Sequence, residues 1–257
     1  MQNNFKNHLI KSFQANVRSD GRKLEEFRKI DVEVNISKTA EGSARVKIGN
    51  TEVLAGVKMI ISTPFPDTPE DGAIMVNAEF LPMASSEFEA GPPGIHSIEL
   101  ARIVDRGLRE SKAIDVKKLC IKKGEKCWAV SVDIITLNDD GNLLDAAALA
   151  TMIAVKNTRY PKFDGIEINY KELTEKQLEM EKLPITVTVC KIGQHLFVDP
   201  MLEEENNIDA RLTVTTLENG EICALQKGGN LPLTIGEVSQ MIDLAAINAE
   251  ELRKHIA

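Results

Sequence analysis

The same order of elements occurs twice along this chain, on either side of a polar, highly charged segment over 171–183. From Lys29 onward, apolar residues alternate with polar ones in the period-two pattern of a half-buried strand. They are Ile30, Val32, Val34 and Ile36. A hairpin and helices follow, and beyond the polar segment come strands, a second hairpin and a helix. This repeated order predicts an α+β fold with two antiparallel or mixed sheets covered by helices.

Two glycine-containing dipeptides predict the hairpin turns. Gly49-Asn50 separates two β-rich runs in the first half, and Asn219-Gly220 separates two in the second half. Both residue types adopt positive φ at little cost, as tight hairpin turns require. After the second hairpin, Thr234 and Glu237 have the spacing of a capping box, which predicts the start of a final helix ending at Ile256.

Helical periodicity appears in three more places. Residues 5–13 carry an apolar side chain every four positions, which predicts an N-terminal helix that docks on the rest of the molecule. The run 98–108 is amphipathic, and Ser97 before it is the expected N-cap. A turn cluster over 138–142 precedes an alanine-rich run over 145–155, which predicts a buried helix.

Length and composition are those of a folded protein with one large or two modest domains. Of 257 residues, 43% are hydrophobic and 27% are charged, far from the signature of disorder. The patterns above divide the chain into an N-terminal helix and turn over 1–28, a first domain over 29–170, a polar linker over 171–183 and a second domain over 184–257.

The sequence lacks both a membrane-spanning or secretory segment and a metal-binding pattern of cysteines. No apolar run approaches the roughly 18–20 residues that span a bilayer, and the first residues lack the apolar core of a secretory signal. We therefore expect a cytoplasmic protein without a membrane partner. The four cysteines show no C-x-x-C spacing, so we expect reduced, buried thiols and no zinc site.

Charge limits how the chain can contact nucleic acid. The net charge is -8, so any such contact must come from a local basic surface. Arg102, Arg106 and Arg109 share one helical face at i, i+4 and i+7. On spacing alone, these side chains are explained as a solvated stripe paired with neighbouring acids. Those acids are Glu99, Asp105 and Glu110.

Several stretches together resemble the RNase PH superfamily. They are RSDGR at 18–22, SARVKIGNTEVLAGVK at 43–58, IELARIVDRGLRES at 98–111 and LLDAAALA at 143–150. Within it, GPPGIHSIELARIVDR at 91–106 and VDPMLEEE at 198–205 are most similar to the non-catalytic ring subunits of archaeal exosomes. The resemblance implies a pseudo-duplicated RNase PH fold whose first half is like domain 2 of ribosomal protein S5. It also implies a phosphorolytic chemistry, in which phosphate attacks the 3′ end of RNA.

The family's phosphate-binding positions are changed in this sequence. Catalytic relatives carry a Gly-Ser/Thr-Arg triplet before the alanine-rich helix, whereas Gly141 is followed here by Asn142 and Leu143. They also carry an arginine pair before the first amphipathic helix, where this chain has Ile95 and His96. Leucine offers neither a donor nor a charge, and a neutral histidine does not replace two guanidinium forks. The resemblance therefore implies that phosphate binding fails.

An acidic remnant persists in the second half. Active members keep two aspartates six residues apart, and here Asp199 and Glu205 occupy those positions. The extra methylene of Glu205 shifts its carboxylate, which catalytic geometry tolerates poorly. Asp145 is expected to add negative charge near the degenerate site. We interpret the acidic run over 199–209 as a solvated loop, so no metal is assigned.

The resemblance implies a non-catalytic subunit that structures the active site of a catalytic paralogue in a ring of three heterodimers. Its partners would be that paralogue, RNA-binding cap proteins and single-stranded RNA. RNA contact is expected at Arg102 and Arg106, with Arg109 beside them. No cofactor is expected on this chain. The complex would use phosphate, and the use of Mg²⁺ stays open.

Two other functions remain open at this point. The chain could be a phosphorolytic 3′–5′ exoribonuclease in its own right, using Asp199, Glu205 and an unidentified arginine. It could also be a stand-alone RNA-binding domain built on the same α+β half. Activity of the lone chain would indicate the first alternative, and a stable monomer that ignores the paralogue would indicate the second.

Overall fold

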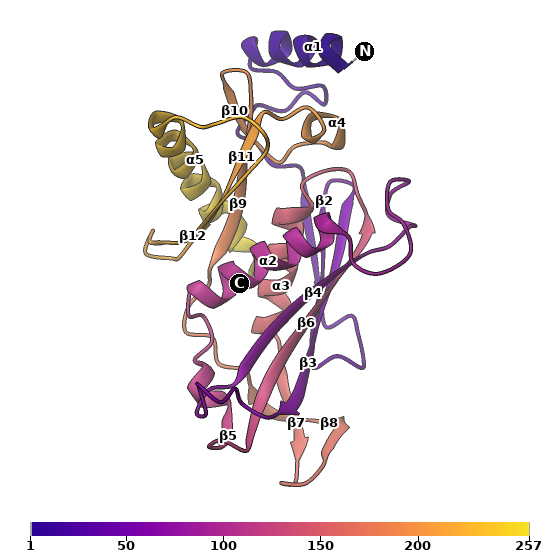
Figure 1. Cartoon of the computed structure of the whole chain (residues 1–257). Coiled ribbons are helices and arrows are strands. Elements are labelled where there is room, and N and C mark those ends of the chain that lie inside the picture. The colour runs from indigo at the N-terminus through magenta and orange to yellow at the C-terminus, as the bar shows by residue number, and fades with distance from the viewer. Residues whose placement is uncertain (1, 257) are drawn as a thin grey trace.

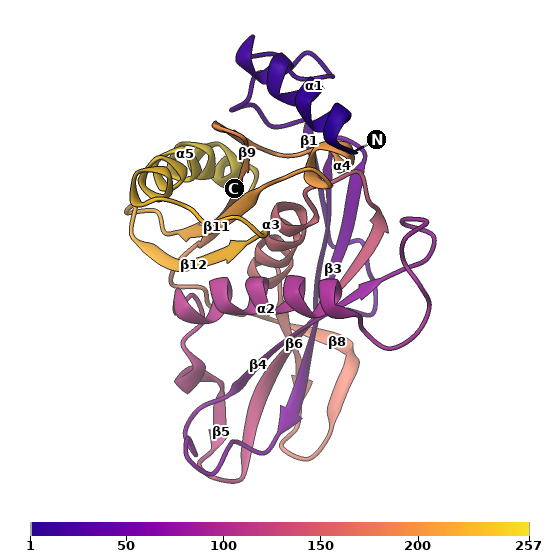
Figure 2. The same ribbon diagram turned by 45° about the horizontal axis from the view of Figure 1, so that its top comes forward.

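The computed structural model describes residues 2–256, which form two large sheets arranged end to end along the long axis of the molecule and a separate two-stranded sheet (Figure 1). Helix α2 (Ile95–Glu110) crosses the molecule between them, and α3 (Leu143–Lys156) lies beside it (Figure 2). A single hydrophobic core extends from the first sheet through both helices to the second sheet. The expected α+β class is confirmed.

The first sheet is mixed and has the strand order β1-β2-β3-β6-β4, with β5 added at one end of β6. Its strands are β1 Ile30–Val34, β2 Gly42–Ile48, β3 Thr51–Ser62, β4 Ala73–Phe80, β5 Cys120–Lys122 and β6 Lys126–Asn138. All pairs are antiparallel except β4 with β6. Alternate residues of β3 are fully buried, because α3 packs on one face of the sheet.

The second sheet is antiparallel and has the order β10-β9-β11-β12. Its strands are β9 Ile185–Ile192, β10 His195–Val198, β11 Ala210–Thr216 and β12 Ile222–Gly228. Helix α5 (Ile235–Arg253) packs on one face, and α2 and α3 pack on the other. The short elements are η1 Val116–Leu119, α4 Leu202–Glu205 and η2 Lys254–Ile256.

Helix α1 (Gln2–Gln14) docks on the second sheet, as its four-residue apolar spacing predicts. Leu9 and Phe13 are buried in a small cluster with Phe197 of β10, and the rings of Phe13 and Phe197 lie 5.0 Å apart. Aromatic pairs at this separation add to the stabilisation that burial alone gives. The N-terminal helix therefore belongs to the second unit in space, although it precedes the first unit in sequence.

The predicted turns and the capping box are confirmed, because β2–β3, β11–β12 and α5 lie where the sequence indicates. Three expectations are wrong. Helix α2 is capped at Gly94, and Ser97 lies inside the first turn, where its hydroxyl donates to the Gly94 carbonyl at 2.9 Å. Much of the expected polar linker is strand β8 (Ile168–Gln177), which pairs with β7 (Arg159–Phe163).

The third correction concerns the cysteines. All four are free thiols, but only Cys127 and Cys190 are buried, and Cys120 and Cys223 are partly exposed. Burial raises the pKa of the Cys190 thiol well above its ordinary value. The buried pair therefore behaves as small apolar side chains.

Candidate functional site

The N-terminus of α3, where the family resemblance predicts the phosphate site of catalytic relatives, meets the second sheet. Gly141 and Asn142 both adopt left-handed backbone, with φ of 83° and 62°. A Cβ on Gly141 would come within 2.5 Å of the Pro200 carbonyl oxygen. Glycine is therefore required both by the turn and by the close approach of the segment after β10.

A buried carboxylate, Asp199, holds this junction together. Arg28 donates to it through its backbone N–H at 2.8 Å, through Nε at 2.8 Å and through Nη2 at 2.7 Å. Arg22 and Asn142 add donors at 2.8 and 2.9 Å. Arg28 also donates to the carbonyls of Asp140 and Gly141, at 2.8 and 3.0 Å. One arginine thus joins the turn before α3 to the acidic segment of the second sheet.

The protonation of Asp199 follows from these contacts. Burial by itself would raise its pKa, but hydrogen bonds and charge attraction from Arg28 outweigh burial and lower the pKa below its ordinary value. The pKa of Arg28 is raised, because its hydrogen bonds and charge attraction to Asp199 outweigh the effect of its burial. The side chain expected as a catalytic remnant is instead an ionised member of a structural network. The expectation of a solvated loop over 199–209 is wrong, because Asp199, Glu204 and Asp209 are buried and Leu202–Glu205 forms α4.

Glu205 occupies the helix end that would bind an anion. Its Oε2 accepts a hydrogen bond from the backbone N–H of Asn142 at 2.8 Å, and the Asn142 side chain makes no capping bond to the helix. Burial raises the pKa of Glu205, and the bond from Asn142 offsets this in part. The neighbouring Leu143 is buried in the core. The positive end of α3 is therefore filled by a carboxylate of the chain itself.

The expected charge on Asp145 needs correction. This side chain is fully buried in α3, and neither carboxyl oxygen has a hydrogen-bond partner among residues 2–256. Thr188 and Asn142 lie beside it but do not meet the geometry of a hydrogen bond. Burial raises the pKa of Asp145 well above its ordinary value, so the group is neutral over a wide pH range.

A cavity of about 380 Å³ remains beside the degenerate site. His96, Leu143 and Glu205 line it, so three of the altered family positions do come together. The other carboxylates in its wall are Glu87, Glu99 and Asp139. Its only cationic side chain among the described lining residues is Arg211, which is paired with Glu99 at 2.7 Å. Ile95 is 83% exposed and takes no part in this cavity.

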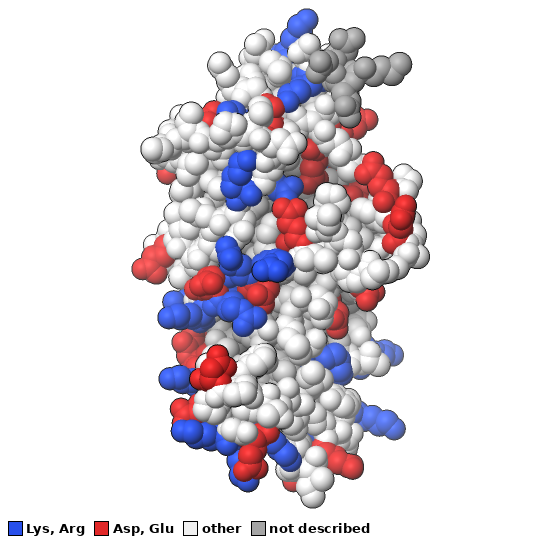
Figure 3. Space-filling view, viewed as in Figure 1, with Lys and Arg blue, Asp and Glu red and all other residues white. Residues whose placement is uncertain are grey.

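The arginines of α2 differ in their surroundings. Arg109 donates to Asp105 at 2.8 Å and to the Ile74 carbonyl at 2.8 Å. Arg102 and Arg106 are exposed, and neither forms an ion pair with another residue in the described part of the chain. Of the three acids expected to pair with this stripe, Glu99 pairs with Arg211 and Asp105 pairs with Arg109. Figure 3 shows Lys and Arg over the surface where α2 and β12 lie, with Asp and Glu among them.

Sequence reasoning missed the cations that join distant segments. Arg18 is buried with Glu204, with its Nε 3.0 Å from Glu204 Oε1, and Arg28 binds Asp199 across 171 positions. Only the resemblance of 18–22 to the family pointed to this region. The turn expected after the N-terminal helix contains Asp20, which accepts a hydrogen bond from the backbone N–H of Arg22 at 3.1 Å.

Residues 2–256 hold no cluster of three or more His, Cys, Asp or Glu side chains placed to bind a metal ion. Within the same residues, the helices are all too short or too polar to cross a membrane.

Two sheets built from repeated strand and hairpin units, with helices packed between them, define the two-domain RNase PH-type fold. The sequence model of the 3′ exoribonuclease family, domain 1, matches residues 26–161, and that of domain 2 matches residues 182–248. The chain therefore belongs to the RNase PH family of 3′ exoribonucleases. The family resemblance inferred from the sequence is confirmed.

Named relatives support the same conclusion. The exosome complex component Rrp42 of Methanopyrus kandleri is 45% identical over 98% of this chain and 95% of its own length. That of Archaeoglobus fulgidus is 45% identical over 97% and 94%.

Solved structures agree with these relatives. A chain of the Archaeoglobus fulgidus exosome with RNA bound to the active site has a TM-score of 0.92 and 44% identity, covering 100% of this chain and 99% of that one. A chain of an archaeal exosome core has a TM-score of 0.87 and 41% identity, covering 99% and 97%.

Proposed function

We propose that this chain is a non-catalytic subunit of an archaeal exosome ring, where it supports the active site of a catalytic paralogue and contacts RNA. The relatives named above are exosome components, and one solved relative comes from an exosome with RNA bound. The partners implied are the paralogue, RNA-binding cap proteins and single-stranded RNA. The expected compartment is the cytoplasm.

The observation that carries the proposal is the occupied end of α3. Phosphorolysis requires a phosphate dianion held by cationic forks and free backbone N–H groups. Here Glu205 already accepts a hydrogen bond from the Asn142 N–H, and the Leu143 side chain contributes no donor and no charge. A phosphate entering this site would displace a carboxylate and lie beside Asp199, whose cationic partners are already engaged. Phosphate would instead be bound by the paralogue.

RNA contact is assigned to Arg102 and Arg106. Both are exposed on α2 without acidic partners in the described chain, so each can pair with a backbone phosphate. Arg109 contributes less, because Asp105 and the Ile74 carbonyl already bind its guanidinium. Such contacts do not depend on RNA sequence, and they weaken as salt rises.

The catalytic part is tested by incubating the purified chain with oligo(A), phosphate and Mg²⁺, alone and then with its paralogue. We expect nucleoside diphosphate release only when both chains are present. Release by the lone chain would establish the alternative of an independent exoribonuclease. A chain that stays monomeric beside the paralogue during size exclusion would contradict the ring subunit.

The RNA part is tested in the reconstituted ring with Arg102→Ala combined with Arg106→Ala. Each lost charged contact should weaken oligo(A) binding by about tenfold, and the salt dependence should fall by about 0.7 per contact. Arg159→Ala is the matched control, since this exposed arginine lies on β7, at the end of the molecule away from the second sheet (Figure 1). Unchanged affinity and salt dependence in the double variant would refute the assignment.

A further inference from the structure

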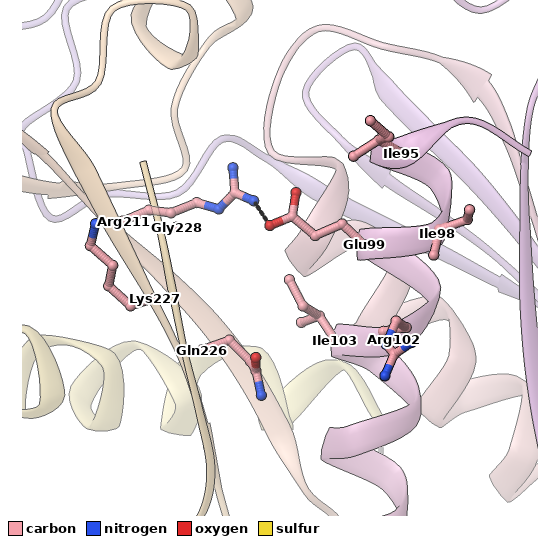
Figure 4. Close-up of a pocket in the computed structure, with 9 residues that line it drawn as sticks. All are labelled: Ile95, Ile98, Glu99, Arg102, Ile103, Arg211, Gln226, Lys227 and Gly228. Carbon is pink, nitrogen blue, oxygen red and sulfur yellow. Dashed lines mark ion pairs between the residues drawn. The ribbon is translucent and has the colours of Figure 1, made fainter. Parts of the chain in front are cut away.

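A groove of about 480 Å³ separates α2 from β12 (Figure 4). One wall is α2, with Ile95, Ile98 and Arg102 along it, and the other wall is the end of β12 with Gln226 and Gly228. This volume lies in the range of about 300–1,000 Å³ that small-ligand sites occupy. The groove is distinct from the cavity beside Glu205, although Glu99 and Arg211 border both.

A glycine gives Arg211 its place in this groove. Gly228 is the partner of Arg211 in the β11–β12 register, and a Cβ on Gly228 would come within 2.6 Å of Arg211 Nε. The missing side chain lets the guanidinium cross the end of β12 and reach Glu99 on α2 at 2.7 Å. Figure 4 shows this ion pair spanning the groove from strand to helix.

The amide of Gln226 is the unexplained feature of the groove. Its Nε2 is buried and has no hydrogen-bond partner among the described residues. A buried donor without a partner costs about 1–3 kcal/mol. In Figure 4 the side chain extends from β12 toward α2. Because Nε2 makes no hydrogen bond, the terminal amide can rotate without breaking one. After this rotation, its N–H groups can donate to a ligand in the groove.

The charges of the groove favour an anion. Arg102 has no acidic partner in the described chain, and the carboxylate of Glu99 is neutralised by Arg211. Lys227 also borders the groove, but its Nζ donates to the Gly229 carbonyl at 2.7 Å, and its side chain projects from the other face of β12. The remaining lining is mostly isoleucine, against which a sugar or base can pack.

We propose that this groove binds one nucleotide of single-stranded RNA, with a backbone phosphate held between the Arg102 guanidinium and the Gln226 amide. This proposal rests on the proposed function, and it extends the RNA-binding surface from α2 to the second sheet. Gln226 is thereby an RNA-binding residue, and Arg211 is a positioning residue that joins the two walls. The RNA then crosses the junction between the two halves of the chain.

The test measures oligo(A) affinity of the reconstituted ring by fluorescence anisotropy over a range of salt. Gln226→Leu should weaken binding by about tenfold without changing the salt dependence, because a neutral donor releases no counterion. Gln226→Glu should weaken it further by adding a negative charge. Gln240→Leu is the matched control, since this exposed glutamine lies on α5, across the sheet from the groove.

A stability measurement separates RNA binding from a structural role. Gln226→Leu removes an unpartnered amide, so its melting temperature should not fall below that of the unsubstituted chain. A lower melting temperature together with unchanged RNA affinity would assign Gln226 to folding and overturn the proposal. Unchanged affinity in both Gln226 variants would overturn it as well.

The two proposals fail in distinguishable ways. If Arg102→Ala weakens RNA binding and Gln226→Leu does not, the ring and its α2 contact stand and the groove site is refuted. If the unsubstituted ring does not bind oligo(A), or does not assemble, the proposed function fails and the groove site fails with it.

Discussion

Arg28 should be among the costliest side chains to remove, because it joins two segments that meet only in the folded chain. Arg28→Ala leaves Asp199 fully buried with Arg22 and Asn142 as its remaining side-chain partners. Breaking a buried charge pair costs about 3–5 kcal/mol. Since two partners remain, we expect about 3 kcal/mol. That corresponds to a fall in melting temperature of about 6–12 °C for a chain of this size.

Two further measurements make this expectation specific. Adding Asp199→Asn to Arg28→Ala removes the unpaired charge, so the double variant should be less destabilised than the sum of the single variants. The loss of stability caused by Arg28→Ala should also depend on pH. The lowered pKa of Asp199 means that its ionised form stabilises the fold above about pH 4 and that this stability is lost as pH falls through the folded pKa.

Urea denaturation of the four proteins at pH 7 and near pH 3 measures both effects. The cost of Arg28→Ala should shrink at the lower pH, because Asp199 in the variant no longer has Arg28 to lower its pKa and its buried charge is lost more readily on protonation. Additive single and double variants, or a fall in melting temperature below about 2 °C for Arg28→Ala, would show that the network does not hold the junction.

Other side chains give independent predictions. Asp145→Asn should stabilise the chain at pH 7 and have less effect near pH 4. Because the pKa of Asp145 is raised in the folded chain, the folded chain holds this proton more tightly than the unfolded chain does. The free energy of unfolding therefore falls by about 1.4 kcal/mol for each pH unit between the pKa of Asp145 in the unfolded chain and its pKa in the folded chain. Urea titrations at both pH values check this, and parallel pH curves would contradict it. Thr234→Ala removes the bond to the Glu237 N–H and should cost about 1 kcal/mol. A melting temperature unchanged from the parent chain would argue against that cap.

Local elements were predictable because their determinants lie close together in the sequence. Gly49-Asn50 and Asn219-Gly220 fix hairpins through backbone preference alone, and Thr234 caps α5 through a residue three positions away. The capping of α2 was not predictable in the same way. Gly94 takes that position without a side-chain bond, and Ser97 turns its hydroxyl back to the Gly94 carbonyl.

The site depends on contacts between distant positions, which no local pattern encodes. Glu205 caps α3 across 63 residues, and Asn142 reaches Asp199 across 57. The residue type at Asp145 predicted a negative charge. The side chain is fully buried, however, and burial favours its neutral form. The altered positions themselves were visible in the sequence, but the contact of the Glu205 carboxylate with the start of α3 appears only in three dimensions.

Measuring whether the lone chain binds phosphate is the most direct test of the proposal that Glu205 fills the phosphate site at the start of α3. Isothermal titration of the purified chain with inorganic phosphate, followed by titration of the ring reconstituted with the paralogue, compares the two states. We predict no saturable binding by the lone chain and saturable binding by the ring. Saturable binding of phosphate by the lone chain would contradict the account, because Glu205 already accepts a hydrogen bond from the Asn142 N–H at this end of α3.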